Sequence, residues 1–175
     1  MIPDEELLQR ANDGDPGAFE ALYRRYRDRV HRLAWRFTGN PQDALDVVQE
    51  TFLYLLKKLP GLRLTASMTT FLYPVVKHLS LNLRRRRGCI EADEEILTAI
   101  PDPSGQPTPR AELAAALAGL SQEQREVVLM RFVDDMSLDE IAEALEVPTG
   151  TVKSRLHRAL DTLRHDPRTR DYFLA

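Results

Sequence analysis

Residues 136–163 read MSLDEIAEALEVPTGTVKSRLHRALDTL, and this stretch decides the fold of the C-terminal part of the chain. Ser137 with Glu140 three residues later predicts a capping box at the start of a helix. The pattern breaks at Glu146-Val147-Pro148, because proline cannot continue a helix. A second helical pattern follows at once, with Thr149 as its predicted cap. Two helices joined by so tight a break predict a helix-turn-helix, a motif that places its second helix in the major groove of DNA.

The second helical pattern separates apolar from basic side chains. Residues 149–165 contain four Lys or Arg and one Asp, a net charge of +3, whereas residues 111–148 contain two Arg and nine Asp or Glu, a net charge of −7. Positive charge concentrated on one helix is typical of a DNA-reading element. A helical hairpin with an ordinary solvated basic face is the alternative, but the cap, the break and the apolar register together favour DNA binding. The apolar stripe consists of Val152, Leu156, Ala159, Leu160 and Leu163.

The segment SLDEIAEALEVPTGTVKSRLHRAL, residues 137–160, resembles the promoter-reading helix-turn-helix of bacterial RNA polymerase sigma factors, and above all that of the small extracytoplasmic-function group. Glu146 is a departure, since the family usually has glycine in this turn. A glutamate in a left-handed conformation there would be strained. The resemblance implies that the second helix reads the −35 promoter element through Thr149, Thr151, Lys153, Ser154, Arg155, His157 and Arg158.

Composition narrows the class of protein. The chain has 175 residues, 43% of them hydrophobic, and a net charge of −3, which fits one ordinary domain or two small ones. A single cysteine, Cys89, excludes an internal disulfide and a cysteine-rich zinc site. We find no apolar run long enough to span a bilayer and no signal-peptide layout, so we expect a cytoplasmic protein without membrane insertion. We expect no metal and no cofactor.

The chain as a whole predicts an all-α fold of two small helical domains joined by a flexible linker, the C-terminal domain being the helix-turn-helix. We place the domains at residues 1–87 and 109–175 and the linker at 88–108, because four prolines and an acidic cluster fall between Gly88 and Arg110. Asp15-Pro16, Gly39-Asn40-Pro41 and Pro60-Gly61 mark helix boundaries in the first domain. Further helices are predicted over residues 69–87 and after Thr108 and Ser121. The acidic cluster consists of Glu91, Asp93, Glu94 and Glu95.

The segment DALDVVQETFLYLLKKL, residues 43–59, carries polar groups on or near one predicted exposed side. A carboxylate metal site is an alternative that the absence of histidine disfavours, and a merely solvated acidic face is another. The segment is similar to the sigma-factor helix that binds the clamp helices of the polymerase largest subunit. That resemblance assigns core polymerase binding to Asp43, Asp46, Gln49 and Glu50.

Residues 67–88 combine aromatic side chains with a basic run. Arginines can hold phosphates while an unstacked base enters a pocket, which suits single-stranded DNA, although a basic helix end is often only solvated. The segment resembles the family's −10 recognition and melting region, with Phe71 where tryptophan is usual. Phe71 and Tyr73 are also candidates for the core, and for Phe71 we favour the core. The resemblance implies −10 contacts from Lys77, His78, Asn82, Arg84, Arg85 and Arg86.

The resemblance spans roughly residues 15–164 and implies a sigma factor, not an enzyme. Its expected partners are core RNA polymerase, promoter DNA and an anti-sigma factor, since such factors commonly hold family members inactive. A conventional operator-binding regulator is the first alternative, but residues 4–87 do not look like a ligand-binding or dimerisation domain. A DNA-processing enzyme such as a recombinase is the second, and we find no catalytic set for it.

Overall fold

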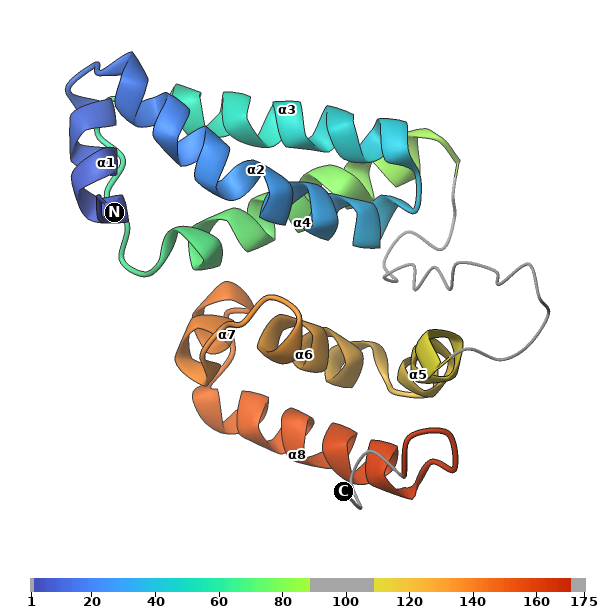
Figure 1. Ribbon diagram of the computed structural model, residues 1–175. Coiled ribbons are helices and arrows are strands. Elements are labelled where there is room, and N and C mark those ends of the chain that lie inside the picture. Colours follow the sequence, from blue (N-terminus) through green and yellow to red (C-terminus); the bar gives the residue numbers. More distant parts are fainter. Residues whose placement is uncertain (1, 89–108, 171–175) are drawn as a thin grey trace. The chain divides into compact units, whose positions relative to one another are not determined.

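The computed structural model describes residues 2–88 and 109–170, and every regular element in these two ranges is an α-helix, which confirms the predicted all-α class (Figure 1). The helices form two compact units, one containing α1 to α4 and the other α5 to α8. The predicted linker 88–108, with Cys89 and the acidic cluster, lies outside the described residues apart from Gly88. The domain boundaries therefore remain a prediction.

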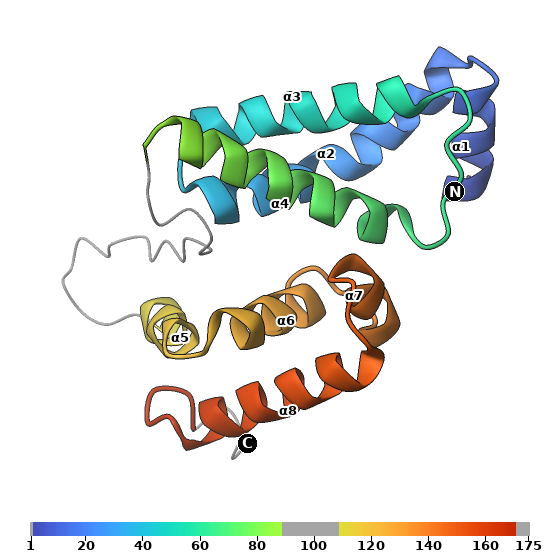
Figure 2. The same cartoon turned by 180° about the vertical axis from the view of Figure 1, so that it is seen from behind.

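The first unit is a small helical bundle made of α1 (Asp4–Asn12), α2 (Pro16–Thr38), α3 (Pro41–Lys58) and α4 (Met68–Arg86). Each of α2, α3 and α4 packs against the other two, and α1 packs against α2 at one end of the bundle (Figure 2). No helix was predicted over residues 4–12. It is held by burial of Leu7, Leu8 and Ala11, three apolar residues in a short and otherwise polar segment.

The helix boundaries of this unit follow the predicted signals. The Asp15 carboxylate accepts hydrogen bonds from the N–H groups of Gly17, at 2.9 Å, and Ala18, at 3.3 Å. Gly39 ends α2 in a left-handed conformation with φ of 64°, which glycine adopts without steric cost. Asn40 then caps α3. The core between the helices includes Phe37 and Tyr73, whose rings meet edge to face with centroids 6.3 Å apart.

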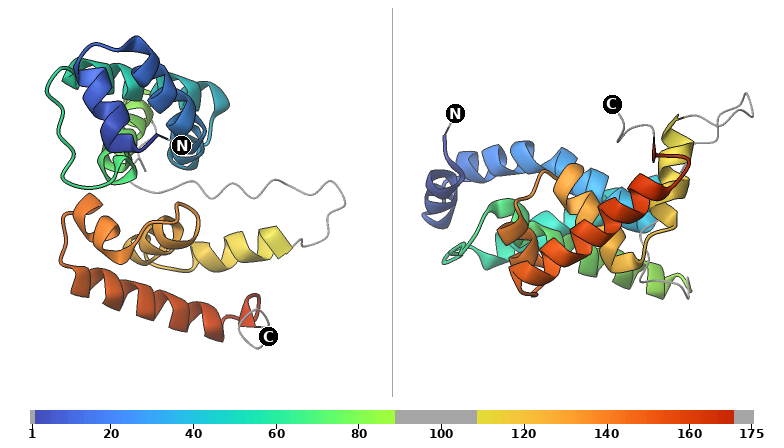
Figure 3. Two further views of the ribbon diagram at one scale, coloured as in Figure 1. Left: turned by 60° about the vertical axis from the view of Figure 1, so that its left-hand side comes forward. Right: turned by 90° about the horizontal axis from the view of Figure 1, so that it is seen from below.

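The second unit consists of α5 (Pro109–Ala118), α6 (Gln122–Phe132), α7 (Leu138–Ala144) and α8 (Thr149–His165). The helix predicted after Ser121 is α6, and a capping box of Ser121 and Gln124 opens it. The long α8 contacts both α6 and α7 (Figure 3). Its apolar stripe closes a core cluster that α5 and α6 complete. The members of this cluster are Ala116, Leu117, Leu120, Val128, Leu129, Ala159 and Leu163.

One buried arginine organises the start of this unit. The guanidinium of Arg125 donates to the backbone carbonyls of Leu117, at 3.0 Å, Ala118, at 3.0 Å, and Leu120, at 3.1 Å. These carbonyls lie at and just beyond the C-terminal end of α5, where backbone acceptors lack helical partners. A cation there also interacts favourably with the helix dipole. Arg125 therefore fixes α5 to α6.

Candidate nucleic-acid interface

The pair α7 and α8 forms the predicted helix-turn-helix (Figure 1). The capping box is present: Ser137 Oγ accepts from the Glu140 N–H at 3.2 Å, and the Glu140 carboxylate accepts from the Ser137 N–H at 2.8 Å. Ile141 and Val152 are fully buried and Ala142 nearly so. The helix start and its apolar register are thus as predicted.

The turn between the two helices is a Schellman motif with glutamate in its left-handed position. The N–H of Glu146 donates to the carbonyl of Glu143 at 3.2 Å, and the N–H of Val147 donates to the carbonyl of Ala142 at 3.0 Å. Glu146 has φ of 54°, a conformation that normally selects glycine. The two hydrogen bonds hold this geometry in spite of the strained residue.

Thr149 does not cap α8, which corrects the prediction. The N-cap is Pro148, without a side-chain cap, and Thr149 is the first residue of the helix. The Thr149 hydroxyl donates to the Asp139 carboxylate at 3.0 Å. It therefore ties the start of α8 to α7 and fixes the angle at which α8 is presented.

Most of the remaining residues of the predicted −35 set lie on the side of α8 that the core leaves open. With 100° per residue, Ser154, His157 and Arg158 point away from buried Val152 and Ala159. These three side chains and Lys153 are exposed, while Thr151 and Arg155 are half-buried. Ser154 Oγ donates to the carbonyl of Thr151 at 2.9 Å. Cations and hydroxyls thus share one surface on the first three turns of α8, which we call the α8 face.

In the first unit, the residues of α4 that were predicted to contact the −10 element differ in their exposure. His78, Arg85 and Arg86 are exposed, and Lys77 and Asn82 are half-buried. His78 Nε2 and Asn82 Nδ2 lie 2.8 Å apart in a hydrogen bond. Arg84 is buried, and it donates to the carbonyl of Phe37 at 3.3 Å. The side chain of Arg84 therefore joins the end of α4 to the end of α2 and does not lie on the surface with the rest of the predicted −10 set.

The two aromatic residues at the start of α4 have different environments. Tyr73 is only 1% exposed and belongs to the core. Phe71 is half-buried, and its ring stacks on that of Tyr54 from α3, with centroids 6.3 Å apart and planes inclined by 28°. Lys58 Nζ lies 5.2 Å from the Tyr54 ring centroid. The interpretation of Phe71 as a core residue holds only in part, because Phe71 is half-buried and its partner Tyr54 is 38% exposed.

The residues of α3 that were predicted to bind core polymerase also differ in their exposure. Gln49 and Glu50 are exposed and Asp46 is half-buried, but Asp43 is only 4% exposed. The Asp43 carboxylate forms an ion pair with Arg87 Nη2 at 2.6 Å, not an aligned hydrogen bond. Asp43 therefore lies on the inward side of α3, contrary to the prediction.

Apolar residues that the sequence analysis did not assign lie beside Gln49. Leu45, Leu53 and Leu56 are each close to half exposed. Their spacing of eight and eleven residues places them on one side of α3, about 20–80° round the helix from Leu45. That spacing was the available signal, but the buried stripe of the same helix is also largely apolar, so the sequence pattern does not tell the two sides apart. We call Leu45, Asp46, Gln49, Leu53 and Leu56 the α3 face.

Other kinds of site find little support in the part of the chain that the structure describes. Within residues 2–88 and 109–170, no three His, Cys, Asp or Glu side chains come together in a way that could hold a metal ion. None of the helices in these ranges is both long enough and apolar enough to cross a bilayer.

Comparison with known proteins identifies the two units separately. The Sigma-70 region 2 model matches residues 22–89, and the Sigma-70 region 4 model matches residues 110–163. The RNA polymerase sigma-E factor of Streptomyces avermitilis is 33% identical over 160 residues, which cover 90% of this chain and 89% of the relative. The ECF RNA polymerase sigma factor SigE of Mycolicibacterium smegmatis is 34% identical over 86% of this chain, which spans 63% of that longer relative.

A solved structure shares the fold. It is that of the sigma factor RpoE in complex with the anti-sigma factor NepR from Bartonella quintana, with a TM-score of 0.63 and 22% identity. The similarity covers 83% of this chain and 94% of that one. At this identity the similarity shows the common fold alone.

Proposed function

The chain belongs to the ECF RNA polymerase sigma factors, and from this premise we propose that it binds core RNA polymerase and directs transcription initiation at particular promoters. The proposed role is non-enzymatic and is carried out in the cytoplasm, where polymerase and promoter meet. The observation that carries the proposal is the pairing of a helix-turn-helix, with its cations on the open side of α8, with a separate unit that presents the α3 face. Residues 1–87 and 109–175 would divide these tasks between them.

The α8 face is the proposed reader of the −35 element. In helix-turn-helix proteins the N-terminal residues of the second helix contact base edges. Arg155 and Arg158 suit guanine or phosphate, since a guanidinium can donate two parallel hydrogen bonds. Lys153 suits phosphate. His157 and Ser154 lie between Lys153 and the two arginines on the surface of the helix. Thr149 acts indirectly, because its hydroxyl is engaged by Asp139.

The first unit would bind both polymerase and the −10 element. On α3, the exposed leucines supply apolar area and Asp46 and Gln49 supply polar groups, a composition that fits a protein partner. On α4, His78, Asn82, Arg85 and Arg86 present donors and positive charge, and the Phe71–Tyr54 stack presents an aromatic surface to an unpaired base. We assign Asp43 and Arg84 structural roles. An anti-sigma factor is the proposed inhibitory partner.

The deciding experiment is in vitro transcription with purified bacterial core polymerase over a promoter library. Enrichment of one pair of −10 and −35 sequences would support the proposal, and no initiation at any promoter would refute it. Arg158→Ala should lower initiation at duplex promoters about tenfold, the effect of losing one bidentate base contact. Arg164→Ala is the matched control, an exposed arginine further along α8 and beyond the matched family region.

The polymerase contact needs its own test. Gln49→Ala and Leu53→Ala should each weaken association with core polymerase, measured by fluorescence anisotropy, while Glu20→Ala on the exposed side of α2 should not. Equal affinities for all three variants would remove the α3 face from the interface.

A further inference from the structure

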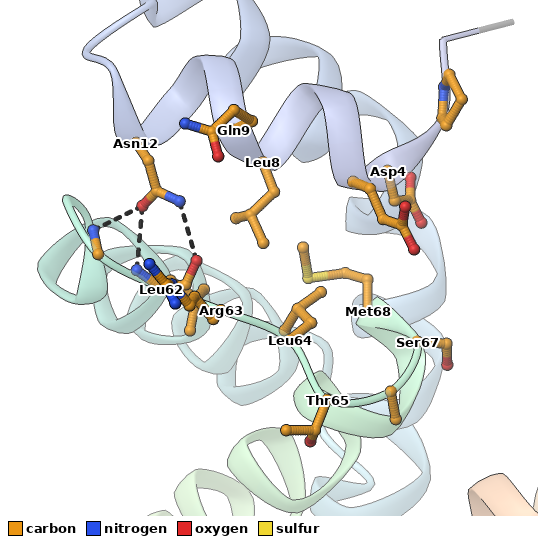
Figure 4. Close-up of a pocket in the computed structure, with 14 residues that line it drawn as sticks. Asp4, Leu8, Gln9, Asn12, Leu62, Arg63, Leu64, Thr65, Ser67 and Met68 are labelled. Atoms are coloured by element: carbon orange, nitrogen blue, oxygen red, sulfur yellow. Dashed lines mark hydrogen bonds between the residues drawn. The ribbon is translucent and has the colours of Figure 1, made fainter.

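The helix that the sequence analysis missed contains an unusual contact. Asn12, the last residue of α1, reaches the connection between α3 and α4 with its side-chain amide (Figure 4). Its Oδ1 accepts from the N–H groups of Gly61, at 2.8 Å, and Leu62, at 3.0 Å, and its Nδ2 donates to the Leu62 carbonyl at 2.9 Å. One amide thus binds three backbone groups of a turn about fifty residues away. Residue 12 also lies outside the matched family region, residues 22–89.

The helix that carries Asn12 is itself firmly attached. Leu7 and Leu8 are buried against the bundle. At the other end of α1 the Asp4 carboxylate accepts hydrogen bonds from the Arg25 guanidinium and the Tyr26 hydroxyl, both on α2. Burial and the hydrogen bond to Asp4 raise the pKa of Tyr26 well above its ordinary value, so this hydroxyl stays a donor. Asn12 therefore projects from a fixed helix towards the turn.

The segment that Asn12 holds leads from one proposed interface to the other. Residues 61–67 follow α3 and end at Ser67, whose side chain caps α4. They border an open groove of about 760 Å³ whose opposite side is α1. Figure 4 shows Leu64 and Met68 on the same side of the groove, facing Leu8. Arg63 and Thr65 are exposed along this segment, close in sequence to the Phe71–Tyr54 stack.

A surface segment of this kind is costly to order when it meets a ligand. Fixing the backbone of one residue costs roughly 1–2 kcal/mol of conformational free energy at room temperature. If the segment becomes ordered only when it binds, this cost reduces the affinity. A segment that is already ordered in the free protein avoids the cost. Asn12 orders the turn in the free protein, since its three hydrogen bonds satisfy backbone groups there.

We propose that Asn12 is a positioning residue for promoter opening. It presets the segment 61–67, and through it the start of α4, so that the separated strand meets Arg63, Thr65 and the half-buried Phe71 in an ordered arrangement. The inference rests on the proposed function and adds a role for α1. The ligand is single-stranded DNA, whose phosphates suit the arginine and whose base faces suit the aromatic stack.

The test compares two templates in transcription by holoenzyme containing the full chain. One is the duplex promoter selected by the wild-type protein, and the other is the same promoter opened beforehand by mismatches across the −10 element. The pre-opened template no longer requires free energy for strand separation. For Asn12→Ala the ratio of duplex to pre-opened activity should fall about tenfold, which corresponds to about 1.4 kcal/mol. Glu6→Ala, an exposed residue of the same helix, should leave the ratio unchanged.

A conservative variant separates positioning from simple loss of stability. Asn12→Asp keeps an acceptor for the Gly61 and Leu62 N–H groups and loses the donor to the Leu62 carbonyl, so its ratio should lie between those of wild type and Asn12→Ala. Permanganate reactivity of unpaired thymines in the duplex promoter should be highest with wild type, intermediate with Asn12→Asp and lowest with Asn12→Ala.

Each result of this comparison either supports or overturns the proposed role of Asn12. A residue that only stabilised the fold would lower transcription from both templates equally, so an unchanged ratio for Asn12→Ala overturns the proposal whether or not total activity falls. If the wild-type chain initiates on neither template, the proposed function fails and this inference fails with it. If the wild type initiates on both templates and the ratio is unaffected by the variant, the inference alone fails.

Discussion

The ion pair between Asp43 and Arg87 provides a direct test of the corrected assignment on α3. Asp43 is the third residue of α3, and Arg87 follows the last residue of α4. The pair therefore joins the beginning of one helix to the end of another. We consider Asp43→Asn, which removes the charge at nearly constant shape, Arg87→Met, and the double variant.

The magnitude follows from the environment of the two groups. Opposite charges about 4 Å apart attract by about 4 kcal/mol at an effective dielectric constant of 20. Two effects reduce this value: desolvation of the buried carboxylate, and solvent screening of Arg87, whose side chain is 49% accessible. We expect a net coupling of about 1–2 kcal/mol. Arg87→Met should cost about 2 kcal/mol, because it leaves a buried carboxylate without its counter-ion.

The assay is thermal unfolding of the full chain by circular dichroism, together with the affinity for core polymerase below the transition. For a domain of this size about 2 kcal/mol lowers the melting temperature of the first unit by roughly 8–16 °C. The double variant should be less destabilised than the sum of the singles by about 1–2 kcal/mol, the coupling itself. All three variants should bind polymerase normally. Asp46→Asn, one turn along the helix, should show the reverse pattern of weaker binding and unchanged melting.

A different pattern would refute this reasoning. If Asp43→Asn melted at the wild-type temperature and yet bound polymerase more weakly, Asp43 would be a docking residue after all. The ion pair with Arg87 would then contribute nothing measurable to stability.

Three further changes test other parts of the fold. Glu146→Gly should stabilise the second unit by roughly 0.5–1 kcal/mol, because it removes a left-handed glutamate; a lower melting temperature would contradict the Schellman geometry. Arg125→Met should destabilise that unit by about 3–5 kcal/mol in urea titration, with Arg125→Lys intermediate, since three carbonyls lose a charged donor. Arg10 holds the pKa of Asp15 below its ordinary value of 3.8, so the carboxylate stabilises the fold above that pH and loses this effect as pH falls through the lowered pKa. Asp15→Asn should therefore melt below wild type at pH 7, and the difference should close as the pH falls below about 3.8; a constant difference would exclude the ionic contribution.

The helix boundaries could be predicted wherever a local signal was present. Four predicted starts have caps in the structure, because a short polar side chain just before an apolar helical pattern can accept hydrogen bonds from the first N–H groups of the helix. The capping residues are Asp15, Asn40, Ser121 and Ser137. Thr149 carried the same signal, but the structure uses its hydroxyl to bind Asp139. A sequence does not show whether a hydroxyl will accept a hydrogen bond from a backbone N–H as a cap or donate one to a neighbouring side chain.

The site assignments were less accurate, since exposure depends on the packing of distant segments. Asp43 and Arg84 have charged side chains of kinds that usually lie at the surface, but both are buried, and each has a partner far away in the sequence. Arg84 binds the carbonyl of Phe37, and Asp43 meets Arg87. Nothing near either residue in the chain indicates such a partner. The exposed leucines of α3 were missed for the related reason that a leucine-rich helix does not show how much of its surface its neighbours cover.

The distribution of charge explains why DNA recognition would depend on a partner. On the α8 face three cations, Lys153, Arg155 and Arg158, are proposed to meet phosphates or bases, while residues 111–148 of the same unit carry a net charge of −7. Neutralising three phosphates gives a slope of about −3 in log affinity against log salt, shallower than the slope of a protein that makes roughly six to ten phosphate contacts. The acidic surroundings reduce non-specific attraction further. In the proposed complex, polymerase bound at the α3 face would supply further affinity, so that few contacts on α8 suffice to select a −35 element.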